Sequence, residues 1–92
     1  MTLVQANATI DRADSLFQRA ARAWERGNNS GNSDAYTRGI AQCGRLRDSA
    51  DALLNPLGIK VDYLGLYPSF NVGPYCYHTT ESAVSAALEG GK

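Results

Sequence analysis

The sequence predicts an α+β fold: two N-terminal helices, a short three-stranded antiparallel sheet and a C-terminal helix, in the order ααβββα. Apolar residues recur at helical spacing up to Leu54, and at every second residue after Gly58. Glycine and proline then divide the rest of the chain into short segments. Ninety-two residues suit a single domain, 1–92, with a helical pair at 2–54 and the sheet and final helix at 58–90.

The first helix is predicted over residues 2–26. Thr2 and Gln5 have the spacing of a capping box, and Gly27 stands where a C-terminal cap glycine is expected. One side of this helix is apolar and consists of Ile10, Ala13, Phe17, Ala20, Ala21 and Trp24. The opposite side, an arc of about 80° at ~100° per residue, holds four arginines: Arg12, Arg19, Arg22 and Arg26.

Residues 27–33 are polar and turn-rich, and they suit a connection to a second, antiparallel helix over 34–54. Ser33 or Asn32 is its expected N-cap, and Asn55-Pro56 should end it. Its apolar side consists of Tyr36, Ile40, Cys43, Leu46, Ala50, Leu53 and Leu54. Gly39 and Gly44 either allow a close helix approach or weaken the helix, since each costs ~1 kcal/mol relative to alanine.

Within this second helix, Arg47 falls inside the apolar arc. We expect its aliphatic stem to cover the core while its guanidinium pairs with Asp51 one turn later. Asp48 and Asp51 are interpreted as residues of the solvated side.

After Gly58, alternation predicts a half-buried strand over 59–63. A bend is expected over 64–69, a second strand over 70–72 and a third over 75–78, after the Gly73-Pro74 turn. Thr79 or Thr80 should cap a final helix that continues to Glu89. Its predicted apolar face is Ala83, Val84, Ala87 and Leu88.

Nine basic residues balance nine acidic ones, and seven of the basic residues are arginine. A zero net charge argues against a general nucleic-acid coat protein but leaves a local basic face open. The chain shows neither a basic leader followed by an apolar run nor a stretch of ~18 apolar residues. We therefore expect a cytoplasmic protein with reduced thiols.

Residues that could carry chemistry are few. Cys76 and His78 share one side of a predicted strand, where side chains stand side by side and do not point at each other. We interpret this pair as a buried thiol beside a histidine that is exposed or hydrogen-bonded to a partner, and Cys43 as a small hydrophobe in the apolar stripe of its helix. A Cys43–Cys76 disulfide stays open on geometry, although a reducing compartment argues against it. We expect no enzyme, metal site or cofactor.

Two surfaces are candidates for binding. The first is the arginine face of helix one, extended by two arginines of helix two; the alternative is a merely solvated helix face. The second is the aromatic group of the sheet, Tyr63, Tyr67, Phe70, Tyr75 and Tyr77, which is divided between core and interface. The candidate partner-binding residues are Arg12, Arg19, Arg22, Arg26, Arg38, Arg45, Tyr67, Phe70 and Tyr75.

With its paired-helix start, tyrosine-rich meander, arginine-lined helices and balanced charge, the chain resembles the type I anti-CRISPR proteins, which are small phage-encoded inhibitors. The resemblance covers the size and character of the whole chain and rests on no shared motif. It implies a non-enzymatic inhibitor that binds an RNA-guided surveillance complex in the cytoplasm of an infected bacterial host and blocks target DNA binding.

The implied partner is a multi-subunit protein–RNA complex, with arginine contacts to acidic groups or guide-RNA phosphates and with neither a membrane nor a small-molecule substrate. The lack of an acidic excess disfavours mimicry of DNA. A small nucleic-acid-binding regulator and an immunity-type partner protein of a mobile element are the alternatives.

Overall fold

The computed structural model describes residues 2–64 and 67–90, although not the side chains of Leu64 and Tyr67. The elements are helix α1 (Leu3–Asn29), helix α2 (Ser33–Leu54), the 3-10 turn η1 (Asn55–Leu57), strands β1 (Ile59–Leu64), β2 (Tyr67–Val72) and β3 (Tyr75–Tyr77), and helix α3 (Thr80–Gly90). This order confirms the predicted ααβββα arrangement.

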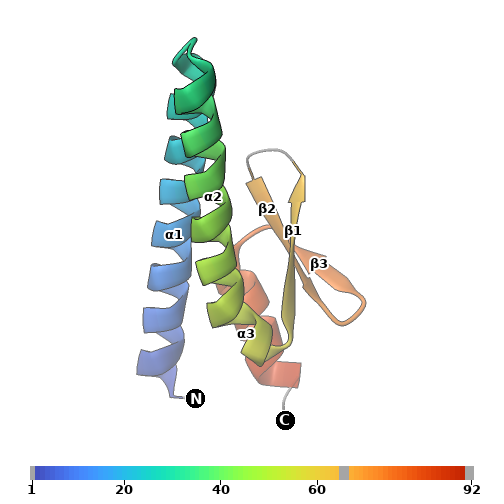
Figure 1. The fold of residues 1–92 in the computed structure, drawn as a ribbon. Coiled ribbons are helices and arrows are strands. Elements are labelled where there is room, and N and C mark those ends of the chain that lie inside the picture. Colours follow the sequence, from blue (N-terminus) through green and yellow to red (C-terminus); the bar gives the residue numbers. More distant parts are fainter. Residues whose placement is uncertain (1, 65–66, 91–92) are drawn as a thin grey trace.

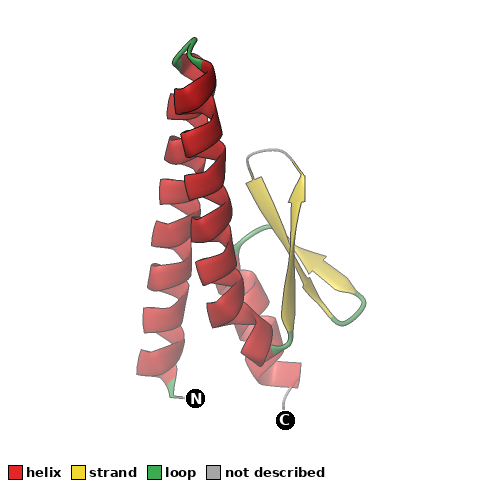
Figure 2. Ribbon diagram, in the orientation of Figure 1, coloured by secondary structure: helices red, strands yellow, loops and turns green. Residues whose placement is uncertain are grey.

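The molecule is elongated because α1 and α2 form a long antiparallel hairpin whose tip extends beyond the sheet and α3 (Figures 1 and 2). The sheet and α3 lie beside the part of the hairpin farther from its tip. The Cα radius of gyration is 14.4 Å and the principal extents are 50 × 26 × 16 Å. A compact domain of this length would have a radius near ~12 Å.

Small residues line the contact between the two long helices. Four of them recur every seventh position of α1 and are buried: Ala6, Ala13, Ala20 and Gly27. On α2 the buried residues are Gly39, Cys43, Leu46, Ala50 and Leu54. A seven-residue repeat keeps one face of a helix against its partner over several turns.

The closest approach of the helices is at Gly27 and Gly39. A Cβ added at Gly39 would lie 2.7 Å from the Ala23 carbonyl oxygen and 2.9 Å from the Gly27 Cα. Gly27 therefore belongs to the interior of α1, and the prediction that it caps the helix is wrong. Of the two interpretations left open for Gly39, the structure shows the close approach, whereas a Cβ at Gly44 would meet open space.

The helix ends agree largely with the sequence. Thr2 Oγ1 accepts from the Gln5 N–H and Gln5 Oε1 accepts from the Thr2 N–H, so the capping box is confirmed. Asn32 is the N-cap of α2, because its Oδ1 accepts from the N–H groups of Asp34 (2.8 Å) and Ala35 (3.1 Å). Helix α2 ends at Leu54, as predicted from Asn55-Pro56.

The sheet is a meander of order β1-β2-β3 with antiparallel pairing throughout. The predicted bend over 64–69 is too long, because β1 continues to Leu64 and β2 begins at Tyr67, and Pro68 pairs with Tyr63 of β1. Proline is tolerated here because β3 pairs only with Phe70–Val72, which leaves β2 without a second neighbour at Pro68.

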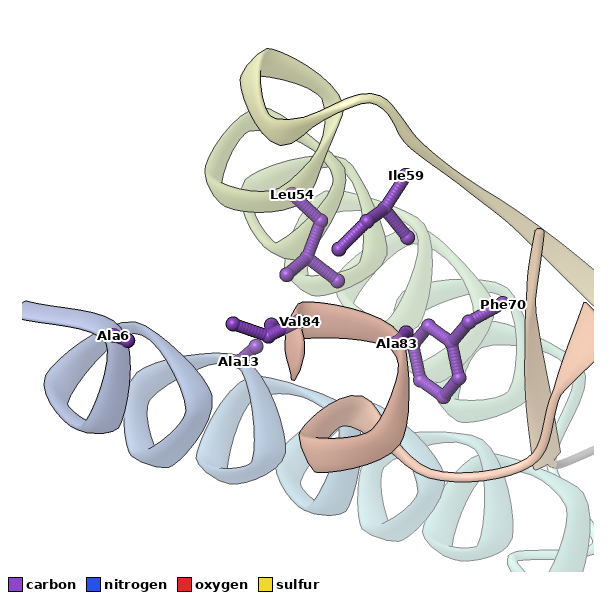
Figure 3. Close-up of a cluster of buried hydrophobic side chains, with 7 residues drawn as sticks. All are labelled: Ala6, Ala13, Leu54, Ile59, Phe70, Ala83 and Val84. Atoms are coloured by element: carbon purple, nitrogen blue, oxygen red, sulfur yellow. The ribbon is translucent and has the colours of Figure 1, made fainter. Parts of the chain in front are cut away.

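The main core lies between the base of the hairpin, the sheet and α3. Figure 3 shows side chains from α1, α2, β1, β2 and α3 converging there: Ala6, Ala13, Leu54, Ile59, Phe70, Ala83 and Val84. Phe70 is 2 % exposed and packs edge-on against Phe17, with ring centroids 5.6 Å apart. The expectation that Phe70 belongs to a partner-binding surface is therefore wrong, because inward alternation along β2 directs its ring into the core.

A second, smaller cluster lies closer to the tip, between the two helices alone. It consists of Ala20, Ala23, Cys43 and Leu46, with Leu16 and Trp24 half-buried against it.

The final helix begins after Thr79, whose Oγ1 accepts from the Ser82 N–H (3.2 Å), while Thr80 is buried.

Candidate partner-binding surface

All six predicted arginines of the hairpin are exposed. Arg12, Arg19 and Arg26 follow one another at seven-residue intervals along α1, and Arg38 and Arg45 have the same spacing on α2. At a rise of 1.5 Å per residue, each interval is about 10.5 Å. The two helices therefore carry two rows of regularly spaced positive charges.

The structure brings three of these arginines together in one surface groove of about 410 Å³ between α1 and α2. Arg26 contributes from α1, and Arg38 and Arg45 contribute from α2. Gly27 and Gly39 are buried in the floor of this groove, where the backbones of the two helices are in contact. We call this site the arginine groove.

The arginine groove faces away from the sheet. Phe17, which packs on Phe70 of β2, lies nine residues before Arg26, and Arg45 lies nine residues before the core residue Leu54. Nine residues turn a helix by about 180°, so both arginines point opposite to the sheet side. Only residues of the hairpin line the groove.

Within the described part of the chain, no residue pairs with the guanidinium groups of the groove. No carboxylate lies in the groove lining, and among residues 2–64 and 67–90 neither an ion pair nor a hydrogen bond engages the side chains of Arg26, Arg38 or Arg45. Elsewhere on α1, Asp11 lies in the depression beside Arg12 and Arg19, and a separate depression holds Glu25 with Arg22 and Arg26.

Arg47 has a different role. Its guanidinium carbon lies 4.4 Å from the centroid of the Tyr63 ring, and the Tyr63 hydroxyl donates to Asp51 Oδ1 (2.7 Å). Asp51 thus faces the sheet, and its assignment to the solvated side of the helix is wrong. Arg47 covers the junction of α2 and β1, as its place in the apolar arc indicated.

The environment of Tyr63 keeps its hydroxyl protonated. Burial raises the pKa of Tyr63 well above its usual 10.0, and donation to the charged Asp51 raises that pKa further. The hydroxyl therefore remains a hydrogen-bond donor between β1 and α2. We assign Tyr63 a structural role.

The other aromatic residues are divided between core and surface. Tyr75 is 66 % exposed and follows the Gly73-Pro74 turn, whereas Tyr77 is half-buried against the main core. The predicted contact through the Tyr67 side chain lies outside the described residues. Tyr36, which was assigned to the apolar side of α2, is 46 % exposed because it lies near the hairpin tip, beyond the sheet.

Cys76 and His78 are both exposed, so the interpretation of Cys76 as a buried thiol is wrong. The reason is register: Phe70 and Tyr77 are paired and face inward, which turns Cys76 and its partner Asn71 to the outer side of the sheet. Cys43 is buried as predicted, and both cysteines are free. The described residues contain no group of three or more histidines, cysteines and carboxylates able to hold a metal ion.

Sequence reasoning missed two components of the groove, the Gly27–Gly39 contact and Gln42, which also lines it. The parallel repeats Ala6-Ala13-Ala20-Gly27 and Arg12-Arg19-Arg26 were the signal that could have revealed them. A seven-residue repeat of small residues beside one of arginines places the charged row along the edge of the helix contact.

None of the helices within the described part of the chain is long and apolar enough to cross a membrane.

Comparison of the chain with protein-family models, with curated proteins and with solved structures gives no match.

Proposed function

We propose that this chain is a non-enzymatic inhibitor that binds an RNA-guided surveillance complex of the CRISPR type and prevents target DNA from binding. The observation that supports a binding role is the arginine groove, which gathers Arg26, Arg38 and Arg45 and has no carboxylate among the described residues of its lining. The choice of partner follows from the resemblance to type I anti-CRISPR proteins.

The chemistry of the groove fits an anionic partner. An arginine presents a planar fork of donors that matches carboxylate and phosphate oxygens, and it stays charged at every physiological pH. A surveillance complex offers both kinds of acceptor, on its acidic protein surfaces and on its guide RNA. Binding there would supply anionic partners to arginines whose side chains no described residue engages.

The shape of the molecule fits insertion between subunits. The hairpin projects beyond the sheet and α3, and the molecule is 50 Å long but only 16 Å across its shortest dimension. Exposed Tyr36 near the tip and Tyr75 on the sheet add aromatic side chains suited to protein contacts. The inhibitor would act in the cytoplasm of an infected bacterial host, where the complex is present.

The regular arginine rows also favour one alternative, a small nucleic-acid-binding regulator. In that case duplex DNA would bind directly, without a protein partner. Against insertion of α2 into a DNA groove, Gly39 holds α2 against α1, and the exposed side of α2 carries Asp34 and Asp48.

The test is to mix the purified chain with purified type I surveillance complexes and to follow assembly by native mass spectrometry. Target DNA binding by the same samples is measured by gel mobility shift. We expect a defined number of copies per complex and loss of target DNA binding. The proposal fails if there is no association at micromolar concentration, or if complexes that carry the chain bind target DNA normally.

Two control results would favour the alternatives. Salt-sensitive binding to random duplex DNA, without association with the complex, would indicate the regulator. Co-purification from the host with one dedicated protein would indicate an immunity-type partner protein.

A further inference from the structure

We infer that the arginine groove binds the phosphate backbone of a single strand of RNA, and that it is the part of the molecule that contacts the guide RNA. The chemistry of the site rests on the geometry of the hairpin. The source of the strand rests on the proposed function.

The floor of the groove is a close helix contact, and its walls carry charged side chains. Gly27 and Gly39 are buried against each other in this floor, because the backbone of the opposite helix occupies the space where a Cβ would lie. Arg26 stands on one wall and Arg38 and Arg45 stand on the other. The three guanidinium groups, one from α1 and two from α2, can donate hydrogen bonds to the oxygens of one or two phosphates.

The helix register extends this site along the hairpin. Gly27 and Gly39 face each other; Arg45 lies six residues after Gly39, about 9 Å along its helix, and Arg19 lies eight residues before Gly27, about 12 Å. Because the helices are antiparallel, Arg19 and Arg45 stand at nearly the same level, about 3 Å apart along the axis.

By the same reasoning, Arg26 and Arg38 form a second pair nearer the tip, and their positions along the hairpin axis differ by about 3 Å. The arginines thus form two tiers separated by about 10.5 Å, and Arg12 continues the α1 row by the same distance. The rows run along the hairpin for about 21 Å, the distance from Arg12 to Arg26.

A regular row of this kind fits a polymer better than a protein surface. A stacked nucleic-acid strand carries a negative charge about every 3.4 Å, so every arginine of the row meets a nearby phosphate in any register. The acidic side chains of a protein have no such continuous repeat.

Gln42 provides the contact that favours RNA. Its exposed side chain lines the groove beside the arginines, and an amide can both donate to and accept from a ribose 2′-hydroxyl. The 2′-hydroxyl is the group by which proteins distinguish RNA from DNA.

The carboxylates of the chain are distributed over several surfaces but leave the lining of the arginine groove free. Asp14 and Glu81 line a cleft of about 370 Å³ on the sheet side, whereas Asp11 and Glu25 lie in depressions beside other arginines of α1. Among the described residues, the groove itself has three arginines and no carboxylate in its lining. Such a site attracts a polyanion locally, although the protein as a whole is neutral.

The first experiment compares two glutamine variants that change the net charge equally. Gln42 lines the arginine groove, Gln18 lines the cleft on the sheet side, and both are exposed. Fluorescence anisotropy is measured at low salt with a labelled single-stranded RNA of mixed sequence. We expect Gln42→Glu to weaken binding by about tenfold or more, since it places a carboxylate among the phosphates, and Gln18→Glu to bind like the parent chain.

The second experiment uses the salt dependence of the same RNA binding. Each lost phosphate contact should reduce the slope of log affinity against log salt by about 0.7 for a single strand. We expect this reduction for Arg26→Ala and for Arg38→Ala, and a smaller one for Arg22→Ala, a matched arginine of α1 outside the groove. Arg26→Lys should keep the slope but lose affinity, because lysine keeps the charge and lacks the fork.

The inference is overturned if the parent chain does not bind the RNA, if Gln42→Glu and Gln18→Glu behave alike, or if polyglutamate competes as well as RNA does. Equal affinity for single-stranded DNA of the same sequence would overturn the choice of RNA. Circular dichroism melting of each variant checks the fold, which substitutions at these exposed positions should leave unchanged.

The two proposals can fail separately. If the surveillance complex retains full affinity for Gln42→Glu, the groove does not contact the guide RNA, although inhibition can stand. If RNA binding depends on the groove but no surveillance complex associates, the groove assignment stands and the proposed function is wrong.

Discussion

At the scale of single residues, two pairs of like residues have opposite roles in this molecule. Gly39 and Gly44 are both interior to α2, but only Gly39 faces the backbone of α1. Tyr63 and Tyr75 are both in the sheet, but only Tyr63 is held by a carboxylate of α2. The contrast makes each pair a matched test of the packing.

We predict that Gly39→Ala and Gly44→Ala change stability in opposite directions. The new methyl at Gly39 would stand 2.7 Å from the Ala23 carbonyl oxygen, so the helices must separate, at a cost of about 1–3 kcal/mol. At Gly44 the methyl meets open space, and the better helix former should stabilise the chain by about 0.5–1 kcal/mol. Urea denaturation measures both; equal effects would contradict the close approach.

We predict that Tyr63→Phe lowers the free energy of unfolding by about 1–2 kcal/mol, because the half-buried Asp51 carboxylate loses its donor. Tyr75→Phe is the control and should be neutral, since the Tyr75 ring is mostly exposed. Urea denaturation at neutral pH measures both variants. Equal stability of the parent chain and Tyr63→Phe would show that this hydrogen bond contributes nothing.

The raised pKa of Tyr63 gives a further prediction for alkaline pH. Above about pH 10.0 the unfolded chain loses the Tyr63 proton while the folded chain keeps it, so stability falls as the pH rises. Below pH 10.0 this contribution is fully present. Urea midpoints measured on both sides of that pH should show a steeper decline for the parent chain than for Tyr63→Phe. Parallel declines would mean that Tyr63 does not titrate abnormally.

At the scale of elements, short polar signals fix where the helices begin and end. Helix α2 depends on Asn32, whose side chain accepts two of the N–H groups that its first turn leaves open. The three residues between α1 and α2, Ser30–Asn32, also contain Gly31 at a φ of 67°, which favours glycine. The tight turn and the cap together set the register that brings Gly27 opposite Gly39.

We predict that Asn32→Ala costs about 1 kcal/mol of stability through the loss of this cap. Asn28→Ala is the matched control: Asn28 is exposed within α1, and alanine is the better helix former there, so its effect should be neutral or slightly stabilising. Thermal unfolding followed by circular dichroism compares them. A neutral Asn32→Ala would mean that the cap does not contribute.

At the scale of the whole molecule, the core is divided along the hairpin. The base buries the large side chains of Leu54, Ile59, Phe70 and Val84 from four elements, whereas the smaller tip-side cluster joins only α1 and α2. Burial of less apolar surface gives less stabilisation. The arginine groove and exposed Tyr36 therefore lie on the less stabilised half of the molecule.

We predict that the tip half of the hairpin opens before the base does. Amide hydrogen exchange measured by NMR should show weaker protection for interior amides near Cys43 than for those near Leu54 and Phe70. Addition of the RNA used above should raise protection near Cys43 selectively. Uniform protection along α2 would show that the hairpin opens as one unit.

The sequence alone determined what depends on neighbours along the chain. The capping box at Thr2 and Gln5, the end of α2 before Pro56, the order of the elements and the exposure of the arginine row follow from local hydrogen bonding, backbone sterics and helical period. Only the tertiary structure decided which groups face each other. Periodicity places a residue on one side of an element but does not identify the surface opposite it. For that reason it took packing to show that Phe70 is core, that Asp51 meets Tyr63, and that three arginines gather in a groove over the Gly27–Gly39 contact.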